Sequence, residues 1–209
     1  MEERQLCGVC LGSRAWKESD RMLSVFCQDG NVYDVLARGA AKPKYKLKFA
    51  AQLFSYGDYF LTPSKAGYYI LGGAVFGELS FLHIAQDPDA YAAACFVCEV
   101  AKTCVRAENK RMYAETVAAL GELASDENVR CDLICLRILL AAFATSGYGF
   151  TFGNDPKGKA CAAVLNAPAG AVSSAEANGE LVRGMIRPLS VRFANRFDKL
   201  QSVGFLPFL

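Results

Sequence analysis

Histidine is nearly absent from this sequence: His83 is the only one among 209 residues. The sequence also lacks a Gly-rich loop followed by Lys and Ser or Thr, which holds nucleotide phosphates, and a Gly-x-Ser-x-Gly nucleophile elbow. No apolar run reaches the roughly 18 residues that a membrane span requires. We therefore predict a binding protein that is not an enzyme, uses no cofactor and does not associate with a membrane.

The overall composition is that of a globular protein, with 53% hydrophobic and 21% charged residues. The first residues, Met1 to Arg4, are acidic, whereas a secretion signal begins with basic residues and continues with apolar ones. We expect a cytoplasmic protein.

Nine cysteines form an odd set, and reduced thiols are expected in the cytoplasm. Two pairs, Cys7 with Cys10 and Cys95 with Cys98, have the Cys-x-x-Cys spacing of zinc and redox sites. In a strand, Cys7 and Cys10 would point to opposite faces, which is unfavourable for chelation. Free cysteine is also among the most buried residue types. We favour core packing and predict no metal site, with a thiol-dependent metal or redox protein as the alternative from another class.

Charge is distributed unevenly, although the net charge is only +2. Residues 78–130 contain nine acidic and five basic residues, whereas residues 181–209 contain five basic residues and one acidic residue. Such a distribution can steer a charged partner without a high total charge.

The most basic stretch is Arg38–Lys48, which has five cations in eleven residues, and no acid lies between Val35 and Gly57. Gly39 and Pro43 predict that it leaves a strand as a loop or sheet edge. An extended backbone would send Lys42, Lys44, Lys46 and Lys48 to one side, as a row of phosphates would require. Lysines at sheet edges also serve to prevent aggregation, so the pattern alone leaves two interpretations open.

Hydrophobic patterning divides the chain into two predicted domains, residues 1–79 and 80–209. The first reads as five short strands with a hairpin turn at Gln28–Asn31, which predicts a small barrel. The predicted strands are residues 6–11, 21–27, 32–37, 52–61 and 67–74.

The second predicted domain is a helical bundle. Asp87 can cap a helix that begins at Pro88 and runs towards Val105. Two more helices are expected over residues 110–124 and from Ser125 or Asp126 to Ser146, and a last one opens at Pro188. Residues 147–180 read as an irregular insert in which Asn154–Gly158 is a loop. Along the last helix, Arg192, Arg196 and Lys199 form a stripe that suits either a solvated face or a second polyanion contact.

A small barrel with a cationic loop is typical of proteins that hold single-stranded nucleic acid, because phosphates pair with cations and bases stack on aromatic rings. Candidate aromatic residues lie within the loop and just beyond it. We assign Phe49 and Phe54 to the barrel core and leave the role of Tyr45 open. Tyr45, Phe49, Phe54, Tyr56 and Tyr59 are the five aromatic residues considered.

Several motifs resemble the bacterial RecO family. The N-terminal ones are Ser13–Asp20, Met22-Leu23-x-Val25-Phe26, Ala37–Ala40 with its basic continuation, and Gln52-x-Phe54. Looser similarity extends through Phe96-x-x-Glu99, Leu136–Leu140 with Gly147–Gly149, and Asp198–Ser202.

This resemblance implies an α+β protein, with a five-stranded OB-fold followed by an α-helical domain, and a non-enzymatic role in recombinational DNA repair. RecO-like proteins bind single- and double-stranded DNA, anneal complementary strands, and act with RecR to load RecA onto DNA covered by single-strand-binding protein. Localisation near the nucleoid is then expected. The positions that match the cationic signature, with Arg21 added for its proximity, are Arg14, Arg21, Arg38, Lys42, Lys44, Lys46 and Lys48.

The sequence departs from the family where many relatives have a zinc-binding cysteine cluster, since only Cys161 lies in that region. Contact with the acidic tail of single-strand-binding protein would need an apolar groove rimmed by cations, for which we consider Arg111, Arg130 and Arg137. A general OB-fold RNA-binding protein is the alternative function.

Overall fold

The structure is a computed structural model that describes residues 3–76, 81–125 and 129–209. The chain divides into two compact units. The first comprises Met1–Leu82 and Val105–Tyr113, and the second comprises His83–Cys104 and Ala114–Leu209. We describe each unit by itself.

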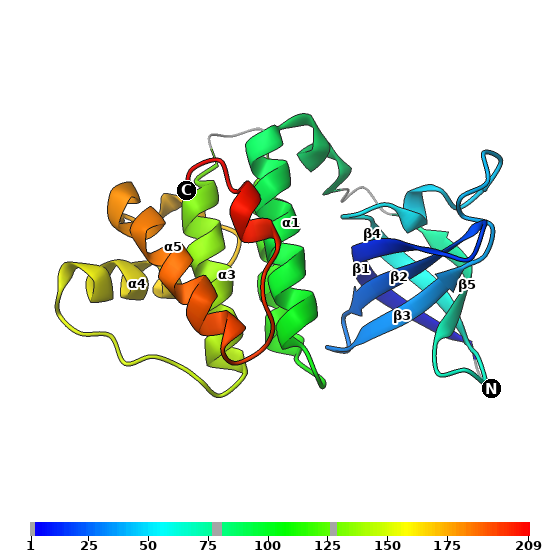
Figure 1. The fold of residues 1–209 in the computed structure, drawn as a ribbon, viewed down its shortest axis with the longest axis horizontal. Coiled ribbons are helices and arrows are strands. Elements are labelled where there is room, and N and C mark those ends of the chain that lie inside the picture. The colour runs from blue at the N-terminus through cyan, green and yellow to red at the C-terminus, as the bar shows by residue number, and fades with distance from the viewer. Residues whose placement is uncertain (1–2, 77–80, 126–128) are drawn as a thin grey trace. The chain divides into compact units, whose positions relative to one another are not determined.

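Five strands form a closed barrel in the first unit, in the order β1-β2-β3-β5-β4 (Figure 1). β3 and β5 pair in parallel, and all other neighbours are antiparallel. This is the connectivity of an OB-fold, and it confirms the predicted fold class. The strands are β1 (Arg4–Trp16), β2 (Asp20–Cys27), β3 (Val32–Ala37), β4 (Tyr56–Pro63) and β5 (Tyr69–Val75).

β1 is longer than predicted, because the polar residues after Leu11 remain in the sheet. Ser13 to Trp16 pair in register with Leu23 to Asp20 of β2. A register shift between Cys10 and Gly12 marks a bulge in β1. The polar segment therefore forms an exposed hairpin end rather than the loop that its composition suggested.

The barrel interior is apolar and includes the fully buried Cys10, Val25 and Tyr59. Residues 105–113 complete this unit. The Asn109 amide donates a 2.8 Å hydrogen bond to the Gly30 carbonyl, and the Tyr113 ring packs edge-on against Phe26. Gly30 has φ +87°, and an added Cβ would lie 2.7 Å from the Asn109 nitrogen, so the turn after β2 requires glycine.

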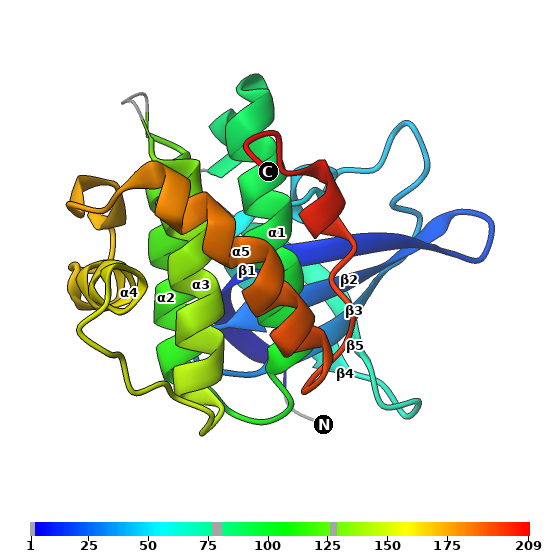
Figure 2. The same cartoon turned by 60° about the vertical axis from the view of Figure 1, so that its left-hand side comes forward.

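The second unit is helical, and α3 is its central helix. Every residue of α3 from Asp132 to Phe143 is buried, and the helix packs against α1, α4 and α5 (Figure 2). The helices are α1 (Pro88–Cys104), α2 (Lys110–Leu123, in this unit from Ala114 onward), α3 (Cys131–Thr145), α4 (Pro156–Asn166) and α5 (Gly179–Ala194).

Helix capping was predicted correctly at α1, where the Asp87 carboxylate accepts hydrogen bonds from the amides of Asp89 and Ala90. The start of α3 was placed too early. Ser125 precedes the helix and Asp126 lies outside the described residues, whereas α3 begins at Cys131.

Two predictions about proline were wrong. Pro156 lies in the predicted Asn154–Gly158 loop but occupies the first turn of α4. An N–H at this position would have no acceptor within the helix, so its absence from proline does not weaken α4. Pro188 does not open the last helix. It lies inside α5, which begins nine residues earlier at Gly179 with Asn178 as its cap. Burial of Val182, Met185 and Ile186 stabilises α5 despite the internal proline.

Candidate nucleic-acid interface

The segment Arg38–Lys48, here called the cationic loop, follows β3 and folds as consecutive turns. Amide-to-carbonyl hydrogen bonds join Lys42 to Gly39 and Tyr45 to Lys42, at 2.9 and 3.1 Å. The loop prediction is confirmed. The extended backbone that would have aligned the four lysines is not present.

An alternation of exposure nevertheless runs along the cationic loop. All five cations are exposed, whereas Tyr45 and Leu47 between them are half-buried and pack against the barrel core. Burial of Tyr45 raises the pKa of its phenol. The two apolar side chains thus hold the loop on the barrel while the cations face solvent.

The beginning of the cationic loop is fixed to the β1–β2 hairpin. The Asp20 carboxylate accepts a 2.8 Å hydrogen bond from the Gly39 amide, and the Ser19 carbonyl accepts one of 2.9 Å from the Ala41 amide. Gly39 has φ +71°, a backbone conformation that glycine adopts without strain. These contacts give the first residues of the loop a defined position.

The hairpin adds further cations beside the start of the loop. Arg14 is exposed, and its guanidinium lies 5.6 Å from the centre of the Trp16 ring. Arg21 is half-buried, donates to the Ser13 hydroxyl, and pairs through its backbone with Ala37, the residue before the loop. The structure therefore brings Arg21 beside Ala37, directly before Arg38, at the same end of the barrel.

These cations are not neutralised by neighbouring acids. Within residues 3–76, 81–125 and 129–209, no carboxylate lies within 4.0 Å of the charged groups of Arg14, Arg21 or the cationic loop. Cations without a carboxylate partner remain free to pair with phosphate oxygens.

The aromatic assignments were correct in part. Phe54 is buried, with 2% exposure, but Phe49 is 61% exposed, so its assignment to the core was wrong. Phe49 begins a short 3-10 turn (Phe49–Ala51) directly after Lys48, and the buried residues of this turn are Ala50 and Ala51. Tyr59 is buried and Tyr56 packs on Phe81, so neither offers a free ring face.

Sequence reasoning missed two residues of this surface. Trp16 and Lys17 lie at the hairpin end, and Lys17 is exposed with φ +54°. A signal was present, because Trp16 is the only tryptophan and alternates with Arg14 in a polar strand.

The three arginines considered for protein partners lie in different environments. Arg111 is exposed at the start of α2. Arg130 is half-buried and forms a bidentate pair with Asp132, at 2.9 and 3.0 Å, and this hydrogen bonding raises the pKa of Arg130. Arg111 belongs to the first unit, whereas Arg130 belongs to the second.

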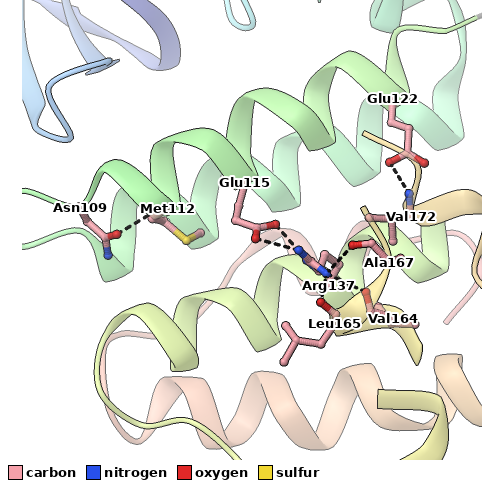
Figure 3. Close-up of polar contacts among 9 residues, drawn as sticks. All are labelled: Asn109, Met112, Glu115, Glu122, Arg137, Val164, Leu165, Ala167 and Val172. Carbon is pink, nitrogen blue, oxygen red and sulfur yellow. Dashed lines mark hydrogen bonds and ion pairs between the residues drawn. The ribbon is translucent and has the colours of Figure 1, made fainter. Parts of the chain in front are cut away.

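Arg137 is buried and fully engaged inside the helical unit (Figure 3). Its Nε and Nη2 donate to the two Glu115 carboxylate oxygens, at 2.9 and 2.8 Å. Its Nη1 donates to the carbonyls of Val164, Leu165 and Ala167 at the end of α4. This geometry gives Arg137 a structural role in joining α2, α3 and α4.

The cysteines are free thiols. Burial raises the pKa of Cys27 and Cys135, and that of Cys131 to about 11, which disfavours the thiolate needed for metal binding or redox chemistry. Within the described residues, no group of three or more His, Cys, Asp or Glu side chains could hold a metal ion. Six cysteines are buried and three half-buried, the latter being Cys7, Cys95 and Cys131.

The barrel connectivity and the exposed cationic loop define an OB-type barrel protein with a helical second unit. Residues 1–74 match the family model described as "Recombination protein O N terminal". This match identifies residues 1–74 as a RecO-type N-terminal domain, and the relatives below extend the similarity to RecO proteins beyond it.

Curated relatives named DNA repair protein RecO align with much of the chain. The protein from Clostridium perfringens strain 13 is 28% identical over 149 residues, which cover 70% of this chain and 59% of the relative. That from Desulfitobacterium hafniense strain DCB-2 is 34% identical over 92 residues, covering 44% and 33%. That from Listeria monocytogenes strain CLIP80459 is 31% identical over 120 residues, covering 56% and 46%. The chain thus spans less than two thirds of the length of these relatives.

None of the helices in the described part of the chain is both long and apolar enough to span a membrane.

Proposed function

We propose that this protein binds DNA through the cationic loop and the adjoining β1–β2 hairpin, as a non-enzymatic mediator of recombinational DNA repair. The observation that carries the proposal is the row of exposed cations of the loop, which have no carboxylate partner among the described residues and are held by Tyr45 and Leu47. Similarity to relatives that are named DNA repair proteins supports the choice of DNA.

Phosphate pairing and base stacking would both contribute to binding. The lysines would pair with phosphates, while Phe49 beside Lys48 and Trp16 beside Arg14 would offer ring faces to bases. This combination suits single strands, because their bases are free to stack. Double-stranded DNA would be held by its phosphates alone.

The proposal extends to annealing of complementary strands, and to RecR and single-strand-binding protein as partners in loading RecA. These activities are inferred from the family resemblance. Arg111 and Arg130 remain candidates for a partner surface because part of each side chain reaches solvent.

The test is the triple variant Lys44→Glu, Lys46→Glu, Lys48→Glu, measured by fluorescence anisotropy with a labelled single strand at low salt. We expect affinity to fall on the order of 100-fold, since three phosphate contacts become repulsive. The matched control is Lys65→Glu, Lys102→Glu, Arg106→Glu, which makes the same charge change at exposed positions elsewhere. Equal affinity in the two triple variants would refute a specific role for the loop.

A general RNA-binding function is the second candidate, favoured by the same barrel and loop. Competition of unlabelled RNA against bound single-stranded DNA separates the two. DNA repair predicts that RNA of matched sequence competes less well than DNA, whereas an RNA-binding function predicts the reverse.

A further inference from the structure

In the helical unit, Arg192 of α5 and Arg196, which follows the end of α5, cover aromatic rings of the segment before α4. The Arg192 guanidinium lies 4.6 Å from the centre of the Phe150 ring, and that of Arg196 lies 5.0 Å from the centre of the Tyr148 ring. Both distances fall within the range of cation–π attraction. We call Tyr148, Phe150, Phe152, Arg192 and Arg196 the Arg–aromatic surface.

The ring contacts orient the two guanidiniums without neutralising their positive charge. Arg192 and Arg196 are exposed, and within residues 3–76, 81–125 and 129–209 no carboxylate lies within 4.0 Å of either. By contrast, Arg183, which lies in α5 like Arg192, pairs with Asp132 at 3.5 Å. A planar guanidinium held on a ring face still directs its N–H donors outward, which suits recognition of phosphate.

Packing against neighbouring phenylalanines fixes the position of these rings. Phe143, which is 1% exposed, contacts both Phe150 and Phe193, while Tyr148 packs against Phe197. Tyr148 keeps 44% of its surface exposed. The side chains therefore form a supported platform with accessible aromatic surface.

A cavity of about 340 Å³ adjoins this platform. Phe150, Phe152, Met185 and Leu189 provide apolar walls, and the charged lining residues are Lys157, Arg192 and one acid, Asp155. The volume is at the lower end for small-ligand pockets. It suits one planar base better than a peptide helix, which is about 10 Å across.

We infer that the Arg–aromatic surface binds a single nucleic-acid strand, with a base in the cavity and the neighbouring phosphates on Arg192 and Arg196. The inference rests on the proposed function in that it assigns a second contact for the same class of ligand. Charge complementarity and the guanidinium planes, on which a base can stack, favour this occupant over an acidic peptide, which would use the cations but would not stack.

The test uses the full chain with Arg192→Glu, Arg196→Glu and a labelled oligo-dT strand. We expect affinity to fall on the order of tenfold, and the slope of log affinity against log salt to become shallower by about 1.4, because each phosphate contact on a single strand contributes about 0.7. Lys102→Glu, Arg106→Glu is the charge-matched control, and it should leave both quantities unchanged.

A second variant blocks the cavity without changing charge. Gly184 lines it, and an added Cβ at Gly184 would meet no atom within 4 Å, so Gly184→Leu introduces an apolar side chain at a position with space for its first carbon. Because leucine also favours the helix more than glycine does, the variant should fold and bind the strand several-fold more weakly. Ultraviolet crosslinking of an iodouridine-substituted strand should label residues 148–152 in the parent chain and lose that label in Gly184→Leu.

Unchanged affinity and salt slope in the arginine variant, with no crosslink at residues 148–152, would overturn the inference. Binding of an Asp- and Phe-containing peptide that is lost in the arginine variant, while strand affinity is retained, would also overturn it in favour of a peptide site. The cationic-loop variant is measured in parallel. Loss of binding there, but not in the arginine variant, would refute only the second surface and leave the proposed function intact.

Discussion

The cationic loop of the barrel and Arg137 of the helical unit use positive charge in opposite ways. In the loop, lysines extend into solvent and no described carboxylate neutralises them. In the helical unit, Arg137 is 7% exposed and its donors are taken up by Glu115 and by carbonyls at the end of α4. Removing a loop lysine should therefore alter binding, whereas removing Arg137 should alter stability.

The largest effect on stability is expected for Arg137→Ala. This change leaves the buried Glu115 carboxylate and the carbonyls of α4 without their donor, and breaking such a pair costs about 3–5 kcal/mol. Urea unfolding followed by circular dichroism measures the loss. The control Arg111→Ala, at an exposed position, should stay within about 0.5 kcal/mol of the parent. Similar losses in both variants would remove the distinction between the two kinds of cation.

An intermediate effect is expected for Phe49→Ala, and it concerns binding rather than folding. Because Phe49 is exposed, its removal should leave the free energy of unfolding nearly unchanged, while the loss of a stacking face weakens single-strand binding by about 1–3 kcal/mol. Anisotropy and urea unfolding of the same sample give both quantities. Phe54→Ala is the contrasting variant, since Phe54 is buried and its truncation should destabilise the barrel by about 3–5 kcal/mol. A Phe49→Ala variant that unfolds as easily as Phe54→Ala would contradict the stacking role.

The smallest effect is expected for Asp20→Ala, which releases the start of the cationic loop from the hairpin. The lost hydrogen bond to the Gly39 amide should cost about 1 kcal/mol of stability. Asp20→Asn retains an acceptor oxygen and also removes the negative charge, so it is the control for charge. If both variants bind DNA more tightly by the same factor and unfold alike, the carboxylate acts only through its charge and does not position the loop.

The barrel was largely predictable because its strands are short, apolar and separated by turn residues. β3 has the predicted bounds, and the helix start at Pro88 follows from Asp87 and the proline beside it. The end of β1 was not predictable from local composition. Ser13 and Arg14 interrupt the apolar pattern, and the segment Ser13 to Trp16 forms a strand because β2 pairs with it.

The helical unit shows where local signals fail. A proline usually marks the first turn of a helix, yet Pro188 lies inside α5 because the burial of Val182 and Ile186 outweighs the lost hydrogen bond. Composition likewise could not distinguish Arg137 from an exposed arginine, because the carboxylate and carbonyls that surround it come from α2 and α4. Phe49 illustrates the converse error, in which an aromatic residue remains exposed while the two alanines that follow it are buried.

The central claim is that the loop lysines contact phosphates, and the salt dependence of single-strand binding tests it most directly. The neutral variant Lys44→Gln, Lys46→Gln, Lys48→Gln removes charge without introducing repulsion. Its slope of log affinity against log salt should be shallower than that of the parent by about 2, since three contacts contribute about 0.7 each. Parallel lines for the parent and the variant would show that the lysines do not contact phosphates.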